Sequence, residues 1–394
     1  MTTATATPTV TLQGVVVPNA HVDPAAFHRY TRRLMTLMKS AAFAGLGQTD
    51  QFSILQTGVV AGLSIRFSGT LTTTHGTGTV ATTARWPYDL IRATRFTANG
   101  QSNLINCSGW KLKARDIMGR GDLTDRGIAQ GIGGASPGTS RTQGTLSLSG
   151  ESWGVGQNVT AIADGAYAVD LNWYLPVAFD FIDLIGAIFA QTSSTDLNLA
   201  IDWAPPADLF VLTGSATAVL TGNFVCEAVL FTIPQAPDGG IIVPDLSAFH
   251  SVIQSRFLPV TGLNEVRLPG QGVGRQLMRV FWQVWNGAPS APLPINAANF
   301  GQMGWRFGGN DTPEIFTDGQ HLHYFNERLF GCDLGTLAGF AVMDFASENA
   351  FRDSIDEAAA TDLRFLCEIL PAVTLSSPFI EHVQETIFAG AVGA

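Results

Sequence analysis

The sequence predicts an all-β fold in which one β-domain occurs twice, and three observations support this prediction. Apolar and polar residues alternate along Val169–Leu175 and again along Leu197–Trp203, which is the pattern of strands with one buried face. The stretch Thr195–Trp203 recurs as Thr361–Ile369, where TDLNLAIDW becomes TDLRFLCEI. A repeat at so long a spacing indicates a duplicated domain, because solenoid repeats recur every few tens of residues. The third observation is the content of 42 glycines and 19 prolines, which suits short strands and many turns.

Composition narrows the class of function. The chain has 394 residues, enough for two domains that each bury a core. Only 14% of residues are charged and 46% are hydrophobic, so we expect much of the exterior to be buried against other subunits, with an unusually large core as the alternative. The net charge of -10 argues against direct nucleic-acid binding, which needs clustered cations.

The N-terminal region predicts an arm followed by a helix. Met1–Val22 is rich in Thr and Ala, which favours an extended arm, and it has no secretion-signal pattern. No apolar run is long enough to span a membrane, so we expect neither secretion nor a membrane span. A helix is predicted to begin at Asp23 as N-cap, with Pro24 at its first position, and to end at Gly45.

This predicted helix is amphipathic and purely cationic. Its apolar residues fall on one face at helical spacing, and no acidic residue lies between Asp23 and Asp50. The basic residues are Arg29, Arg32, Arg33 and Lys39. Two interpretations remain open: an anchor on anionic lipid headgroups, or a docked helix with a solvated basic face.

The rest of the first half predicts strands around one short helix. Leu63–Thr72 alternates cleanly, and Leu90–Thr97 leads into Asn99-Gly100, the strongest signal for a two-residue hairpin turn. A helix is predicted over Ser108–Met118, with Ser108 as N-cap and Gly119 as its stop. Gly131–Gly156 has the composition of a long exposed loop.

The two halves are predicted to divide at Pro234–Pro244, a linker rich in Pro and Gly. In the second half, Gln276–Trp285 is apolar on both faces, which predicts a strand covered on both sides. Thr317–Leu329 predicts a short helix that matches the Ser108 helix in position, and Gly339–Phe345 is the counterpart of the strand ending at Pro176. Pro378–Ala394 predicts a short helix with a small-residue tail.

Several motifs could carry chemistry, and each has a simpler explanation. Gly150–Gly154 matches the GxSxG nucleophile elbow with Ser152, but the residues that follow are a poor start for the helix that the elbow requires. His321 and His323 could share a metal ion on a strand, whereas on a helix their side chains would point apart. Neither motif predicts a catalytic residue, a cofactor or a metal site.

Two further groups of residues are given structural interpretations. The cysteines lie far apart, without the spacing of a metal site, and are expected to be buried thiols: Cys107, Cys226, Cys332 and Cys367. An acidic run is expected to be a solvated face, because nothing pairs its members for acid–base work: Asp353, Asp356, Glu357 and Asp362.

Three stretches resemble the tectivirus-type double jelly-roll major capsid proteins of tailless icosahedral phages with an internal membrane. They are Asp89–Asp116 with its strand, turn and helix, Trp173–Trp203 with LPVAF and IDLIGAIFAQ, and Val243–Ser255 with PDLSAF. The resemblance spans nearly the whole chain and is clearest over the first half and the linker. It carries no catalytic residue, because the motifs of that family are packing and turn residues.

The resemblance implies a double jelly roll of two eight-stranded barrels with an N-terminal amphipathic helix and short flanking helices. The expected divisions are an arm and helix over 1–50, jelly rolls over 51–236 and 248–377, a linker over 237–247 and a tail over 378–394. It implies homotrimers that form pseudo-hexagonal capsomers and tile a virion capsid over an internal viral membrane near the N-terminal helix.

Further partners implied by the resemblance are neighbouring capsomers and minor capsid and vertex proteins, with the host cytoplasm as the location before assembly. No small-molecule substrate is expected. The alternatives are a jelly-roll hydrolase with Ser152 as nucleophile, or a carbohydrate-binding jelly-roll module.

Overall fold

The computed structural model describes residues 9–120, 162–191, 196–268, 274–287, 291–306, 315–331, 339–346, 354–357 and 362–389. Within these ranges, no helix is both long enough and apolar enough to cross a membrane. The loop predicted over Gly131–Gly156, together with Ser152, lies outside them.

In each half of the chain, a group of strands is followed by a helix and then by further strands. The N-terminal segment contains β1 (Thr9–Leu12), β2 (Val15–Pro18), β3 (Ala20–Val22) and α1 (Pro24–Tyr30). The first half contains β4 (Arg33–Ala42), β5 (Thr49–Ser53), β6 (Val59–Thr74), β7 (Val80–Thr82), η1 (Tyr88–Leu90), β8 (Ile91–Ala98), β9 (Gln101–Cys107), α2 (Gly109–Arg120), β10 (Gly165–Pro176), β11 (Ile188–Phe189), β12 (Leu197–Trp203), α3 (Pro206–Leu209), β13 (Phe210–Leu212) and β14 (Thr217–Phe231). The second half contains β15 (Ile241–Val243), β16 (Ala248–Phe257), β17 (Gly262–Arg267), β18 (Arg275–Asn286), β19 (Ala291–Pro292), β20 (Phe300–Arg306), β21 (Ile315–Phe316), α4 (Gly319–Phe330), β22 (Phe340–Asp344), β23 (Ile355–Asp356), β24 (Arg364–Ile369) and β25 (Phe379–Ala389).

Both halves have the same strand order, which confirms the predicted duplication. In the first half the sheets run β10-β6-β14-β4 and β9-β8-β12-β5, and in the second β22-β18-β25-β16 and β21-β20-β24-β17. Each of the eight strands in these two sheets of one half has a counterpart at the same place in the other half. The strands β12 and β24 that contain the repeated motif correspond, as do β10 and β22, and the helices α2 and α4. Two facing four-stranded sheets of this order form a jelly roll.

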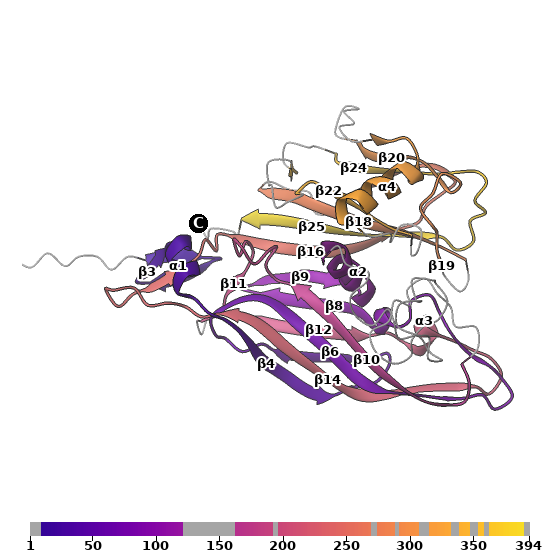
Figure 1. Ribbon diagram of the computed structural model, residues 1–394, viewed down its shortest axis with the longest axis horizontal. Coiled ribbons are helices and arrows are strands. Elements are labelled where there is room, and N and C mark those ends of the chain that lie inside the picture. The colour runs from indigo at the N-terminus through magenta and orange to yellow at the C-terminus, as the bar shows by residue number, and fades with distance from the viewer. Residues whose placement is uncertain are drawn as a thin grey trace, which may run out of the picture.

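The two jelly rolls are joined edge to edge. Strand β16 of the second half pairs in parallel with β9 of the first, through Val252 opposite Ile105 and Ile253 opposite Asn106. One sheet therefore continues through both halves in the order β19-β18-β25-β16-β9-β8-β12-β5. Figure 1 shows this sheet passing from β18, β25 and β16 of the second half, in the upper part of the view, to β9, β8 and β12 of the first half, in the lower part.

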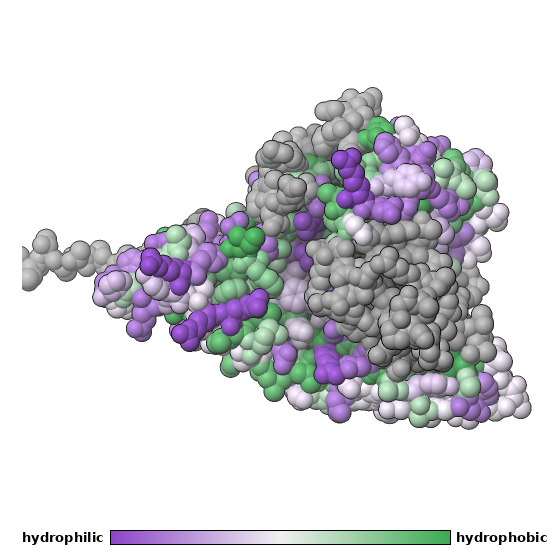
Figure 2. All heavy atoms as spheres, in the orientation of Figure 1, coloured by the Kyte–Doolittle hydropathy of each residue, from purple (hydrophilic) through white to green (hydrophobic). Residues whose placement is uncertain are grey.

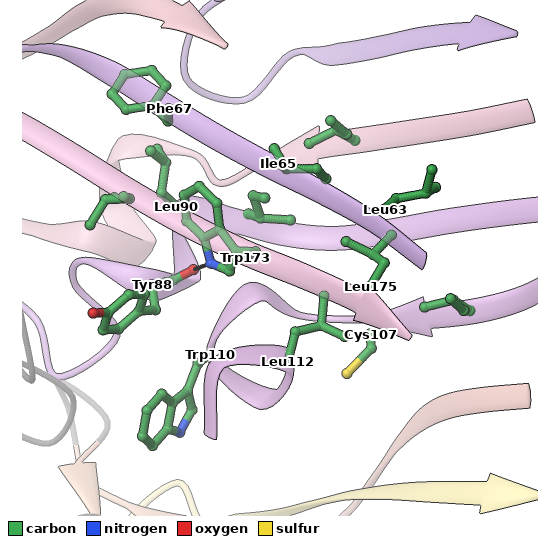
Figure 3. Packing of buried hydrophobic residues seen from close by; sticks show 14 of the residues in the cluster. Leu63, Ile65, Phe67, Tyr88, Leu90, Cys107, Trp110, Leu112, Trp173 and Leu175 are labelled. Atoms are coloured by element: carbon green, nitrogen blue, oxygen red, sulfur yellow. Dashed lines mark hydrogen bonds between the residues drawn. The ribbon is translucent and has the colours of Figure 1, made fainter. Parts of the chain in front are cut away.

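The core of the first jelly roll follows from the alternation in its strands. Leu63, Ile65 and Phe67 of β6 and Trp173 of β10 are fully or almost fully buried, and Figure 3 shows them packed together. The indole Nε1 of Trp173 donates a hydrogen bond of 3.1 Å to the carbonyl oxygen of Tyr88. This bond satisfies the one polar atom of that side chain, as burial of a tryptophan requires.

The predicted hairpin turn is confirmed, and the predicted helix of the second half is capped at both ends. Asn99 and Gly100 both have positive φ, 50° and 75°, which is the conformation of the predicted hairpin turn between β8 and β9. Helix α4 has Asp318 as its N-cap, accepting from His321 N at 2.8 Å, and Gly331 in the left-handed conformation at its C-terminal end.

The predicted cationic helix over Asp23–Gly45 is mostly wrong. It begins as expected, because Asp23 Oδ1 accepts from Ala26 N at 2.9 Å, but it ends at Tyr30. Arg33–Ala42 forms β4, which is hydrogen-bonded along β14. The apolar residues of this stretch have helical spacing, but pairing with the edge of β14 outweighs this local pattern.

The predicted C-terminal helix is also wrong. Phe379–Ala389 is β25, which pairs with β16 on one side and β18 on the other and is buried along most of its length. Its two acidic side chains, Glu381 and Glu385, are buried and pair with cations of the first half. The range 378–394 therefore contains a central strand of the second jelly roll.

The N-terminal arm is packed where the structure describes it. Strand β1 pairs with β2, β3 pairs in parallel with β15, and Leu12 and Ala20 are buried. The expectation of an unpacked arm is thus wrong for residues 9–22. Because β4 lies in the sheet β10-β6-β14-β4, the first jelly roll also begins before residue 51. The boundaries of the linker, residues 237–247, stay a prediction.

The pairing of β6 and β14 requires two glycines directly opposite each other, Gly69 and Gly222. A Cβ atom at Gly222 would lie 2.5 Å from the backbone oxygen of Ser68 and 2.7 Å from the Cα of Gly69. We expect Gly222→Ala to lower the free energy of unfolding by about 1–3 kcal/mol, because the backbone must move to admit the methyl group. Chemical denaturation measures this, and an unchanged midpoint would contradict the close approach.

Candidate functional site

Helix α2 carries the polar contacts between the two jelly rolls. Ser108 is its N-cap as predicted, since its carbonyl accepts from Leu112 N at 3.1 Å, although the helix extends one residue beyond Gly119. Asp89 of η1 adds a second cap, because its Oδ1 accepts from Trp110 N at 3.2 Å. We call the contact of η1 and α2 with β18 and β25 the inter-barrel seam.

One half of the inter-barrel seam is centred on Glu381 of β25. Arg85 bridges Asp89 Oδ2 at 2.9 Å and Glu381 Oε1 at 3.0 Å. Trp285 Nε1 donates to Glu381 Oε2 at 2.9 Å, and Lys111 Nζ lies 3.5 Å from the same oxygen. The Arg85 guanidinium also stacks 4.8 Å from the centre of the Trp285 ring. Glu381 is thus held from both jelly rolls at once.

A buried amide lies beside this cluster. Gln283 of β18 is fully buried, and its Oε1 accepts from Trp110 Nε1 at 3.0 Å. Lys111 Nζ donates to the same oxygen in a short contact. Both donors come from α2, so this amide is a second polar link across the inter-barrel seam.

The other half of the inter-barrel seam is centred on Glu385. Arg115 of α2 donates through Nε to Glu385 Oε1 in a short contact and through Nη2 to Oε2 at 3.4 Å. Arg279 Nη1 and His250 Nε2 each lie 3.9 Å from Glu385 Oε2. Arg279 Nε also pairs with Asp344 at 2.9 Å. Glu385 is fully buried, so these partners replace its hydration.

The charges of the inter-barrel seam balance. Burial opposes ionisation of Glu381 and Glu385, but the cations beside them outweigh it and hold the pKa of both carboxyls below its usual range. Burial raises the pKa of Asp89 and lowers that of Lys111 to about 8. The cations are Arg85, Lys111, Arg115 and Arg279, and the carboxylates are Asp89, Asp344, Glu381 and Glu385.

Sequence reasoning missed the inter-barrel seam entirely. The available signal was FIEHVQETIFA, in which two acids stand in an otherwise apolar and amide-rich stretch near the C-terminus. Except for Arg279, their cationic partners are in Arg85–Arg115, on the far side of the predicted linker, and no local pattern joins the two. The arrangement positions charges for holding two domains in one geometry.

The predicted cationic residues are exposed but do not share one helix. Arg29 is on α1, Arg32 follows it, and Arg33 and Lys39 are on β4. The connection is fixed by Thr232, whose Oγ1 accepts from Arg32 N at 2.9 Å and whose carbonyl accepts from Thr31 Oγ1 at 2.6 Å. We call the four cations, together with the exposed apolar residues near them in the chain, the basic surface. The apolar residues are Tyr30, Leu34, Met35 and Leu37, which are 59%, 46%, 55% and 57% exposed. Figure 2 shows hydrophobic atoms exposed over β4 and β14.

The two histidines of the HLH motif lie in different surroundings on one helix. His321 and His323 lie on α4, as the helical interpretation required, with His321 exposed and His323 buried. Among the described residues, no three metal-binding side chains come together.

The cysteine and acidic residues are only partly as predicted. Cys107, Cys226 and Cys367 are buried free thiols, and Cys332 lies outside the described residues. Asp353 also lies outside them. Asp356 is exposed and Asp362 pairs with Arg364 at 2.8 Å, but Glu357 is buried, so the expectation of a fully solvated acidic face is wrong there.

The fold defines a class: it is the double jelly roll of viral major capsid proteins. Solved structures similar to this chain include the major capsid protein of Sulfolobus turreted icosahedral virus, at 13% identity and a TM-score of 0.62, over 91% of this chain and 97% of that chain. Another is the capsid of the virus PBCV-1, at 12% identity and a TM-score of 0.52, over 91% and 95%. No protein-family model and no curated protein matches the sequence. At these identities the likeness establishes the fold.

Proposed function

We propose that this chain is the major capsid protein of a tailless icosahedral bacteriophage of the tectivirus-like type and acts through assembly. The observation that carries the proposal is the repeated strand order, joined edge to edge and held by the buried charges of the inter-barrel seam. A subunit of two barrels locked in one geometry is the unit that a homotrimer needs to present six barrels as a pseudo-hexagonal block.

The surface supports assembly. Large apolar side chains are exposed between β16 and β17, where Leu258 and Val260 are 83% and 63% exposed, and on α4, where Tyr324 is 59% exposed. In a chain with so few charges, such residues suit contacts with other subunits, neighbouring capsomers, and minor capsid and vertex proteins. The proposed location is the virion capsid, with the host cytoplasm before assembly.

Solution mass tests the homotrimer. We expect light scattering of the purified chain to give three times the chain mass of 41.9 kDa, and concentrated samples to form hexagonal arrays in electron micrographs. A monomer at all concentrations would contradict the trimer, and a trimer without arrays would contradict the capsomer.

The basic surface is proposed to face the internal viral membrane. It combines four exposed cations with exposed apolar side chains, and the one acidic residue of the paired strand β14 is the half-buried Glu227, opposite Leu37. Cations near an anionic membrane contribute about 1 kcal/mol each. A triple variant with Arg29→Glu, Arg32→Glu and Lys39→Glu should therefore bind anionic vesicles at least about tenfold more weakly than the wild type.

The matched control for vesicle binding is a variant with Arg92→Glu, Arg267→Glu and Arg328→Glu, which changes the net charge equally at exposed positions of β8, β17 and α4. It should bind as the wild type does. Equal loss in both variants would attribute binding to net charge, and no loss in the first triple variant would contradict the membrane-facing role. Point substitutions are required because deletion of this segment would remove β4 from its sheet.

A further inference from the structure

An amine, an amide and a carboxylate meet at the centre of the inter-barrel seam. Lys111 Nζ contacts Gln283 Oε1 and lies 3.5 Å from Glu381 Oε2. Lys111, Gln283 and Glu381 are 2%, 0% and 4% exposed. The rings of Trp285 and Phe340 lie 5.7 and 5.4 Å from Nζ. The nucleophile and electrophile of an amide exchange are thus held together where water is excluded.

The surrounding groups suit this reaction. Trp110 Nε1 donates to Gln283 Oε1 at 3.0 Å, which polarises the carbonyl and would stabilise the oxyanion formed by attack on its carbon. The Glu381 carboxylate is placed to accept a proton from the attacking nitrogen. Burial lowers the pKa of Lys111 to about 8, so more of this amine is neutral at physiological pH than in an ordinary lysine.

We propose that Lys111 and Gln283 form an intramolecular isopeptide bond that links the two jelly rolls covalently. The neutral Lys111 Nζ forms a bond to Gln283 Cδ, and Glu381 takes the proton released by this nitrogen. The Cδ–Nε2 bond then breaks as Glu381 passes that proton to Nε2, and ammonia leaves. No oxidant, reductant or further reactant is needed, and the net products are one secondary amide and one ammonia.

The product fits its surroundings. Glu381 keeps Arg85 Nη2 at 3.0 Å and Trp285 Nε1 at 2.9 Å as donors, and Trp110 still donates to the amide oxygen. The reaction replaces a buried ammonium group, which is costly to desolvate, by a neutral amide. The inter-barrel seam then holds one carboxylate more than its cations, and Asp89, whose pKa is raised by burial, is the carboxylate that can take up a proton to restore the balance. The crosslink would prevent the two jelly rolls from separating.

A second amine–amide pair supplies the comparison. Lys113 Nζ donates to Asn172 Oδ1 at 2.9 Å, but Asn172 is exposed and both residues belong to the first jelly roll. Water competes at that position, so no bond is expected there. Lys113→Arg is therefore the matched control for Lys111→Arg.

Mass spectrometry of the denatured full-length chain tests the proposal. We expect the wild type and Lys113→Arg to be lighter than their sequences by about 17 Da, the mass of ammonia, and Lys111→Arg to have its full mass. A protease digest of the wild type should contain one branched peptide with both Lys111 and Gln283. Separate recovery of these two peptides, with no mass loss after a week of incubation of the folded wild type at pH 8, would overturn the proposal. Because the wild type itself is measured, the test does not depend on the folding of any variant.

Discussion

Glu385→Ala is expected to lower the free energy of unfolding by about 3–5 kcal/mol, because it leaves buried cations without their counter-ion. Glu385 is fully buried and is the shared partner of Arg115 and Arg279. Without this carboxylate, both guanidinium groups lose the partner that takes the place of their hydration. Chemical denaturation, followed by tryptophan fluorescence, measures the loss as a shift in midpoint.

Glu265→Ala is the control for the effect of burial. Glu265 also pairs with two arginines, Arg306 at 2.6 Å and Arg364 at 3.0 Å, but these side chains are partly exposed at the surface of the second jelly roll. We expect a loss of about 1 kcal/mol or less, since water can replace the lost partner. Equal losses of unfolding free energy in the two variants would show that burial does not increase the contribution of Glu385 to stability.

Acid is expected to destabilise the fold between about pH 6.5 and pH 4. Burial lowers the pKa of both His250 and His382 to about 4. In this range the unfolded chain binds protons at these residues and the folded chain does not, so stability is present above pH 6.5 and is lost as the pH falls. The pKa of Glu381 and of Glu385 is lowered, so their protonation removes further stability at lower pH. The pKa of Asp89 and of Asp344 is raised, so their protonation has the opposite effect on stability.

His382→Phe isolates one of these histidines. The His382 ring stacks on Phe257 at 4.9 Å and, among the described residues, its nitrogens make no hydrogen bond, so phenylalanine keeps the contact and removes the titration. Between pH 7.5 and pH 5, the free energy of unfolding of the variant should fall by about 2 kcal/mol less than that of the wild type. Urea denaturation at the two pH values measures this. His321→Phe, at an exposed position of α4, should follow the wild type; if His382→Phe does so too, His382 is not the group that titrates.

The local sequence determined most of the strands, both short helices and the duplication. Alternation along β6, β10 and β12 specified one buried face, and Asn99-Gly100 specified a turn, because these signals depend only on neighbours in the chain. The repeat of β12 as β24 identified two copies of one domain before any packing was known.

Tertiary structure alone decided the identity of β4 and β25 and the position of the inter-barrel seam. The sequences of both strands are compatible with helices, and each became a strand because a sheet offered it hydrogen-bonding partners, β14 for one and β16 with β18 for the other. Glu381 and Glu385 resemble surface acids until Arg85, which precedes η1, and Lys111 and Arg115 of α2 meet them from the other half of the chain. A buried charge needs its counter-ion in space rather than in sequence, so no local pattern could have revealed these pairs.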